Sequence, residues 1–195
     1  MSSPSAEIKI DNQIFGRTPY ELELPEGEYL LTLTPEDDET DATQSASWNG
    51  KVSINAHSLT YVNRELGSSD LLSSGVTFSV KKMDRKPSKA DSGEIEIRTE
   101  PDGAIVFLDN EEQGIAPLIL SEVSQGDHEV SVYSPGFSRL SQKIRVQPQH
   151  RIIGDFKLSL DPTYKKIKKE EKKEATESAK IQKQTILTIK ETSTG

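Results

Sequence analysis

The sequence has no cysteine, few aromatic residues and no long apolar run. Its 195 residues include no Cys, and aromatic residues make up 6% of them. The absence of Cys excludes disulfide scaffolds, thiolate zinc sites, iron–sulfur clusters and thiol nucleophiles. No apolar run approaches the roughly 20 residues that cross a bilayer, so we expect no membrane span in this chain. Apolar residues make up only 32% of the chain, which predicts thin hydrophobic cores.

The charge is unevenly distributed. The formal net charge is −8, from 24 Lys and Arg against 32 Asp and Glu. Residues 161–195 hold 9 of the basic and 6 of the acidic residues, so this tail carries +3 and residues 1–160 carry −11. Nucleic-acid binding requires clustered cations that displace phosphate counterions. An acidic body of this kind therefore predicts no nucleic-acid partner.

An internal repeat relates residues 6–19 to residues 104–117 at a constant offset of 98. After a slip of one residue, the segment that begins at Gly27 matches the segment that begins at Gly126. The identities fall at small or turn-forming residues and indicate a duplicated structural unit. The identical pairs are Ala6 and Ala104, Asp11 and Asp109, Asn12 and Asn110, Gly16 and Gly114, and Pro19 and Pro117.

Apolar and polar residues alternate with period two in both copies, which predicts short half-buried strands. The Asp-Asn pairs favour tight turns, and the repeated glycines supply a positive φ where the chain needs one. Further strands are predicted at residues 47–54, 58–62, 76–80, 139–146 and 152–160. The alternating residues are Ile8, Ile10, Leu22, Leu24, Tyr29, Leu31 and Leu33 in the first copy, and Val106, Leu108, Leu118, Leu120, Val130 and Val132 in the second.

These patterns predict an all-β chain of two small antiparallel β-sandwich domains in tandem. The domains cover residues 6–85 and 92–160, and a polar segment with Pro and Ser separates them. Residues 161–184 are predicted to be a Lys/Glu-rich linker. Residues 185–195 would suit the first strand of a truncated further domain, and the pattern leaves open whether the chain is a fragment.

The motifs between residues 92 and 160 resemble the PEGA domain family. Asp102 stands where the family signature has Glu, and the first copy resembles a divergent PEGA unit with an insertion around residues 42–66. The resemblance implies an immunoglobulin- or transthyretin-like β-sandwich from a bacterial or archaeal surface protein, with no catalytic or metal-binding residues. Residues 184–195 weakly resemble the start of a bacterial Src-homology-3-like domain. The motifs are Pro101-Asp-Gly-Ala104, Asp109-Asn110, Gly114-x-x-Pro117, Gly126-Asp-His128 and Tyr133-x-Pro-Gly-Phe137.

Candidate metal ligands are sparse. The histidines His57, His128 and His150 have no metal-ligand spacing, and His128 occupies the position of Tyr29 in the repeat, which favours a packing role. The acidic loop Glu36–Asp41 has carboxylates that suit Ca²⁺, but it lacks the spacing of a calcium-binding loop, so a solvated loop is favoured. We therefore predict no metal-binding, cofactor-binding or catalytic residues, no cofactor and no enzymatic activity.

Two further features have alternative interpretations. Trp48 and Tyr61 would suit an aromatic platform for sugars, although packing in the core or between the domains is the favoured interpretation. The Lys-rich segment 164–183 would suit an anionic polymer or lipid surface, although it lacks an apolar face and a solvated linker is favoured.

These features predict a non-catalytic structural or adhesive module of a larger bacterial envelope protein, located outside the cell or at its surface. Its partners would be a protein or a cell-wall polysaccharide. One alternative is a carbohydrate- or peptidoglycan-binding module. The other is an intracellular scaffold in the cytoplasm, because residues 1–5 have no signal-peptide character.

Overall fold

The computed structural model describes residues 1–36, 45–56, 58–85 and 87–164. Its contacts divide the chain into two units, Met1–Leu160 and Asp161–Gly195. Nearly all of the predicted linker, the predicted strand at 185–195, most of the acidic loop and His57 lie outside the described residues. No described helix is long and apolar enough to cross a membrane.

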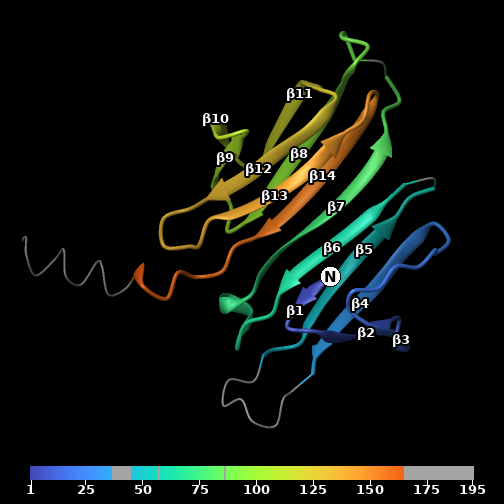
Figure 1. Ribbon diagram of the computed structural model, residues 1–195, viewed down its shortest axis with the longest axis vertical. Helices are drawn as coiled ribbons and strands as arrows, with labels where there is room; N and C mark the ends of the chain where they lie inside the picture. The colour runs from blue at the N-terminus through green and yellow to red at the C-terminus, as the bar shows by residue number, and fades with distance from the viewer. Residues whose placement is uncertain (37–44, 57, 86, 165–195) are drawn as a thin grey trace, which may run out of the picture. The chain divides into compact units, whose positions relative to one another are not determined.

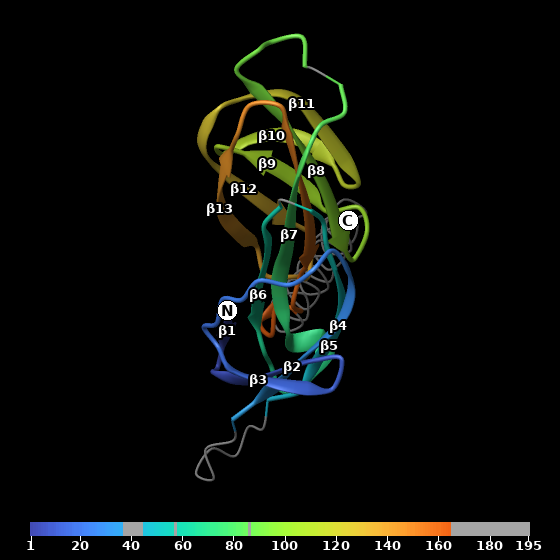
Figure 2. The same ribbon diagram turned by 90° about the vertical axis from the view of Figure 1, so that its right-hand side faces the viewer.

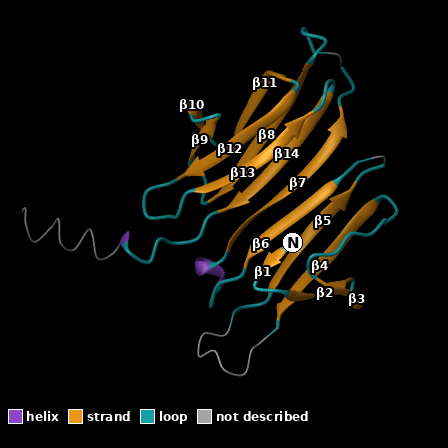
Figure 3. Ribbon diagram, in the orientation of Figure 1, coloured by secondary structure: helices purple, strands orange, loops and turns teal. Residues whose placement is uncertain are grey.

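The described strands form three sheets, which confirms the all-β prediction (Figures 1 and 3). The shared sheet has the order β1 (Ser2–Ser3), β6 (Thr60–Glu65), β7 (Ser74–Lys82), β14 (His150–Lys157), β8 (Ser92–Glu100), β11 (Leu118–Ser124). The first small sheet has the order β3 (Gln13–Arg17), β2 (Ala6–Ile10), β4 (Gly27–Pro35), β5 (Trp48–Ile54). The second small sheet has the order β10 (Glu111–Ile115), β9 (Ile105–Leu108), β12 (Gly126–Tyr133), β13 (Leu140–Val146). A 3₁₀ turn covers Asp70–Leu72.

The first half of the unit (residues 1–85) and the second half (residues 92–160) have the same strand plan. The orders β3-β2-β4-β5 and β10-β9-β12-β13 correspond strand for strand along the chain. Among the described strands, each half also has one parallel pair, β1 with β6 and β8 with β14. The prediction of purely antiparallel domains is therefore wrong at these two pairs, because strand alternation does not indicate the direction of a partner strand. Figure 2 shows the two small sheets gathered toward opposite ends of the unit.

The predicted Asp-Asn turns are confirmed in both halves. Asp11 and Asn12 have φ values of 48° and 68°, and their counterparts Asp109 and Asn110 have 50° and 68°. The two aspartates also act alike, because Oδ1 of each accepts a backbone N–H bond of 2.9 Å, from Leu30 in the first half and Glu129 in the second. The local sequence therefore sets these turns, as Asn and Asp tolerate left-handed backbone better than most residues.

Strand β7 joins the two halves into one sheet. It pairs antiparallel with β6 on one side and with β14 on the other, the latter from Gly75↔Lys157 to Lys82↔His150. The strands of both predicted domains thus belong to one continuous sheet. The polar segment expected between them lies in the connection from β7 to β8. Local alternation identifies strands but not their distant partners, so the sequence did not reveal this joint.

The two small sheets cover opposite faces of the shared sheet. Side chains alternate between faces along a strand, and paired residues lie on the same face. Tyr61 pairs with Phe78, and both belong to the core beneath the second small sheet. Val62 pairs with Thr77 on the other face and packs against the core of the first small sheet.

The strand predicted around Leu22 and Leu24 is not formed. No strand lies between the end of β3 at Arg17 and the start of β4 at Gly27. Its counterpart β11 does form, because it pairs with the nine-residue β8. In the first half the strand at that position is β1, which has only two residues. Segment 20–26 therefore lacks the partner that makes β11 a strand.

Candidate functional site

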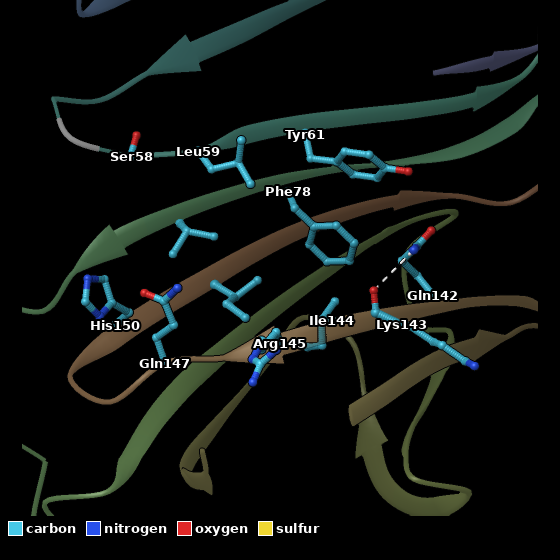
Figure 4. Close-up of a pocket in the computed structure, with 12 residues that line it drawn as sticks. Ser58, Leu59, Tyr61, Phe78, Gln142, Lys143, Ile144, Arg145, Gln147 and His150 are labelled. Carbon is cyan, nitrogen blue, oxygen red and sulfur yellow. Dashed lines mark hydrogen bonds between the residues drawn. The ribbon is translucent and has the colours of Figure 1, made fainter. Parts of the chain in front are cut away.

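Two grooves lie where the outer strands β5 and β13 of the small sheets approach the shared sheet. The polar groove beside β5 has a volume of about 460 Å³. The apolar groove beside β13 has a volume of about 450 Å³ and is drawn in Figure 4. Because β5 and β13 occupy corresponding positions, the two grooves are counterparts with different chemistry.

The apolar groove has an aromatic and aliphatic floor. Figure 4 shows Phe78 between Tyr61 of β6 and Ile144 of β13. Leu59, at the β6 side, is 62% exposed. The cations Lys143 and Arg145 flank Ile144 on β13 and also line the groove. The groove therefore suits an apolar group with a polar or acidic neighbour.

The polar groove contains a buried arginine that is only partly satisfied. Arg64 is 9% exposed, and its Nη2 donates to Thr77 Oγ1 at 3.3 Å. Its Nε and Nη1 are buried and have no hydrogen-bond partner among the described residues. Burial lowers the pKa of Arg64 to about 10, against the opposing effect of the nearby carboxylates Glu100, Asp155 and Asp70. A buried guanidinium whose N–H groups are not all hydrogen-bonded favours an oxygen atom close to it.

Trp48 supports the guanidinium. The Cζ of Arg64 lies 4.1 Å from the centroid of the Trp48 ring, which is a cation–π contact. The ring also lies against the backbone at Gly50, where an added Cβ would stand 2.2 Å from the ring atom Cζ2. Only glycine at position 50 leaves the indole in this place.

The rest of the polar groove carries paired charges. Lys157 Nζ lies 3.3 Å from Glu100 Oε1 and also contacts Asp70. Burial raises the pKa of Asp155, and the nearby Glu96 adds to the rise while Arg98 opposes it. Cations and carboxylates thus stand side by side, an arrangement that suits a ligand with both donors and acceptors.

Trp48 and Tyr61 do not form the aromatic platform considered for sugars. Trp48 lines the polar groove and Tyr61 lines the apolar groove, on opposite faces of the shared sheet. Each packs against a different core, which confirms the favoured interpretation of packing. The alternation of strand residues explains the separation. No sequence pattern identified Arg64, whose role depends on the distant Trp48 and Thr77.

The repeat predicts a packing role for His128, and the structure shows it in hydrogen bonds near the start of β12. Its Nδ1 lies 2.6 Å from Asp109 Oδ2 and its Nε2 lies 2.9 Å from the carbonyl of Ser124. Burial alone would lower the pKa of His128, but the bonds to these two acceptors outweigh it and the pKa is raised. The pKa of Asp109 is lowered, first by the N–H of Glu129 and then by His128.

The other candidates that the structure describes, His150 and Glu36, have separate local partners. His150 Nδ1 lies 2.8 Å from the carbonyl of Pro148, within a turn beside the apolar groove. Glu36 forms an ion pair of 2.6 Å with Arg17. Among the described residues, no group of three or more His, Cys, Asp and Glu is placed to hold a metal ion. The calcium prediction for Glu36–Asp41 falls mainly on residues outside the described ranges.

Comparison with protein-family models identifies one domain. Residues 92–160 match the PEGA domain model, so this part of the chain is a PEGA domain. The matched range begins with β8 and ends after β14, and so covers the whole second half. No curated protein and no solved structure matches the chain. The match defines a β module and assigns no specific activity.

Proposed function

We propose that residues 1–160 are two PEGA-like β-sandwich units of the immunoglobulin or transthyretin type, the first a divergent copy of the second. Together they serve as a non-catalytic structural or adhesive module of a larger bacterial envelope protein at the cell surface. The corresponding strand orders and the matching Asp-Asn turns support a tandem copy. The PEGA match of the second half supports the module class.

The observation that carries the proposal is the joint between β7 and β14. All eight residues of β14 pair with β7. Across the joint, the rings of Phe78 and Phe156 meet edge to face, with centroids 5.5 Å apart. A hydrogen-bonded joint with a shared core resists bending and twisting, whereas a flexible linker does not. A stiff connection between units is what a spacer or a load-bearing adhesive requires.

Single-molecule stretching of the full chain tests the joint. We expect one unfolding event for both halves, whereas two separate events of similar length would contradict a mechanically joined module. The variant Ser79→Pro is the matched perturbation. The N–H of Val80 donates to Leu59 in β6, so the N–H of Ser79 faces β14 and is lost in proline. Ser79→Pro should split the event in two, and Ser79→Ala should leave it single.

The proposed location needs a test of its own. An antibody against residues 92–160 should label intact cells of the source organism, and external protease should remove the signal. Labelling that appears only after the cells are opened would instead support the intracellular scaffold.

A second candidate function, carbohydrate or peptidoglycan binding, is favoured by the polar groove. Arg64 and Lys157 line this groove as donors, and Asp155 lines it as an acceptor. A wall-polysaccharide pull-down should retain the full chain and lose it in Arg64→Leu. Arg145→Leu, in the apolar groove, is the matched control and should bind normally. Binding that survives Arg64→Leu excludes the polar groove as the site.

A further inference from the structure

Strand β13 is the last strand of the second small sheet and pairs with β12 and with no other described strand. Which of its main-chain groups face outward follows from Glu129 in β12. The N–H of Glu129 donates to Asp109 Oδ1 at 2.9 Å, and its carbonyl accepts from the N–H of Asp109 at 2.8 Å. Glu129 therefore faces β9, and its partner Lys143 in β13 faces away from β12.

The same orientation recurs at every second residue of β13. Its register with β12 is regular from Val132↔Leu140 to Gly126↔Val146, so Ser141, Lys143 and Arg145 direct their N–H and carbonyl groups to the outer edge. Figure 4 shows the carbonyl of Lys143 accepting from the side chain of the neighbouring Gln142, at 3.2 Å. Among the described residues, no strand bonds these groups.

The surface beside this edge is the apolar groove. Tyr61 pairs with Phe78, and the N–H of Val80 donates to the carbonyl of Leu59 at 3.0 Å, so these four side chains lie on one face of the shared sheet. The groove lies between them and β13, as Figure 4 shows. Because stacked sheets lie about 10 Å apart, a strand added to the outer edge of β13 would cover this apolar floor.

The groove is cationic on an acidic body. Its lining residues include Lys143 and Arg145 but no Asp or Glu, although residues 1–160 carry a net charge of −11. On the inner side the two cations pair with Glu129 and Asp127 of β12. Opposite charges on neighbouring strands stabilise a sheet, and like charges destabilise it. A second copy of β13 would bring its own cations against these two, so the charge favours an acidic strand.

The counterpart edge, on β5 in the first half, differs. The N–H and carbonyl of Leu30 both bond the Asp-Asn turn, so its partner Lys51 faces outward and is the counterpart of Lys143. On β5, however, the hydroxyl of Thr60 donates to the carbonyl of Ser53 at 2.9 Å, so the shared sheet itself bonds this edge. The groove beside β5 also contains carboxylates. The β5 edge is therefore a control for the β13 edge.

We propose that the outer edge of β13 binds an extended acidic strand of a partner polypeptide. Alternate residues of the bound strand are apolar and pack on Leu59 and Tyr61, on the same side as Ile144. The residues between them are Asp or Glu and lie beside Lys143 and Arg145. Main-chain bonds to β13 provide affinity, and the alternation of apolar and acidic side chains provides specificity. This site does not depend on the mechanical role proposed for the joint between β7 and β14.

A strand peptide tests the site on the full chain. The probe is the capped peptide Thr-Glu-Val-Glu-Val-Glu-Val-Glu-Thr, and the control Thr-Val-Val-Val-Glu-Glu-Glu-Glu-Thr has the same composition without the alternation. The probe should slow amide exchange at Lys143 and Arg145 by at least about tenfold and leave Lys51 and Ser53 unchanged. No slowing at millimolar probe, or equal slowing by the control, overturns the proposal.

A pair of proline variants tests the edge itself. Lys143→Pro and Lys51→Pro each remove one lysine and one outward-facing N–H, a change that edge strands tolerate. Lys143→Pro should abolish the effect of the probe at Arg145, whereas Lys51→Pro should preserve it. Circular dichroism checks that both variants are folded. Should Lys143→Pro not fold, Lys143→Glu should weaken probe binding by at least about tenfold, with Lys51→Glu as its control. Unchanged binding in the Lys143 variants overturns the proposal.

The chain without peptide distinguishes the other possible occupants. The amides of Lys143 and Arg145 should then exchange within about tenfold of the rate of an unstructured chain, at every protein concentration. Protection that grows with protein concentration would show that a second copy occupies the edge. Strong protection that is independent of concentration would show that another segment of the same chain occupies it. Either result overturns the assignment to a partner polypeptide.

Discussion

In the second half the strand β8 has nine residues beside β14, whereas the described strand β1 at the equivalent place in the first half has two residues beside β6. The same turns, the same small-sheet order and the same parallel pairing occur in both. In the second half Ile95 and Ile97 fill the core from β8, and β11 forms beside them. In the first half the counterpart of β11 stays irregular. Pairing with β8 therefore explains why β11 is a strand.

The two halves also differ in the type of residue at equivalent positions. Phe156, which pairs with Thr99, is 2% exposed and lies in an apolar core. Arg64 pairs with Ser2 at the equivalent position of the first half and is a buried cation over Trp48. His128 binds Asp109 by an ionic hydrogen bond, whereas its counterpart Tyr29 donates to the carbonyl of Pro25 at 3.0 Å. A shared backbone plan therefore tolerates opposite chemistry at equivalent positions, which is how one groove becomes polar and the other apolar.

The largest expected effect comes from the joint between the halves. Phe156→Ala should lower the free energy of unfolding by about 3–5 kcal/mol, because it leaves a cavity against Phe78. Urea unfolding followed by the fluorescence of Trp48 provides the measurement. Trp48 lies in the first half, so its transition should shift together with the far-ultraviolet circular dichroism. An unchanged Trp48 transition would show that the halves unfold independently.

The turn aspartates should differ in their contribution. Asp11→Ala removes one accepted backbone bond and should cost about 1 kcal/mol, whereas Asp109→Ala also removes the partner of His128 and should cost about 2 kcal/mol. Thermal or urea unfolding of both variants checks the order. Equal losses would mean that the contact with His128 adds nothing to the second turn.

Arg64→Leu should change the free energy of unfolding by no more than about 1 kcal/mol, and a gain in stability is allowed. The substitution removes the contact with Trp48, but it also removes two buried nitrogens that have no partner. Urea unfolding measures the difference, with Arg64→Lys as the control that keeps the charge. A loss as large as that of Phe156→Ala would show that Arg64 is a core residue in its own right.

The smallest expected effect is the pH dependence that His128 and Asp109 contribute in the second half. The pKa of His128 is raised above its ordinary value of 6.5. Its stabilising contribution is therefore fully present below pH 6.5 and is lost as the pH rises through the raised pKa. Asp109 has the opposite effect at acid pH, because its pKa is lowered. The stability that Asp109 contributes is fully present above the ordinary pKa of 3.8 and is lost as the pH falls through the lowered pKa.

Unfolding of His128→Tyr across this range measures the effect. The difference from the parent chain should be largest below pH 6.5 and should shrink above it, by about 1 kcal/mol or less because Asp109 is half exposed. A difference that grows with rising pH contradicts the ionic hydrogen bond.

The local residue pattern predicted most turns and strands, but it did not predict which strands pair with one another. The Asp-Asn turns and most strands follow from residue type and alternation. Leu22 and Leu24 alternate equally well, yet no strand forms there, because a strand needs a neighbour that the sequence pattern does not reveal. Strand β8 and the pairing of β7 with β14 escaped prediction for the same reason. Arg64 was missed because its position is set by the register of β6 with β7 and by contact with Trp48.

Native-state hydrogen exchange of the full chain tests most directly whether the outer edge of β6 is less covered than the equivalent edge of β14. Arg64 pairs with Ser2 and Phe156 pairs with Thr99, so Thr60 and Val62 of β6 correspond to Ile152 and Gly154 of β14. Among the described residues no strand pairs with Thr60 and Val62 on the outer side of β6, whereas β8 pairs with Ile152 and Gly154. The amides of Thr60 and Val62 should exchange at least about a hundredfold faster than those of Ile152 and Gly154. Equal protection at the two pairs would contradict an open edge in the first half.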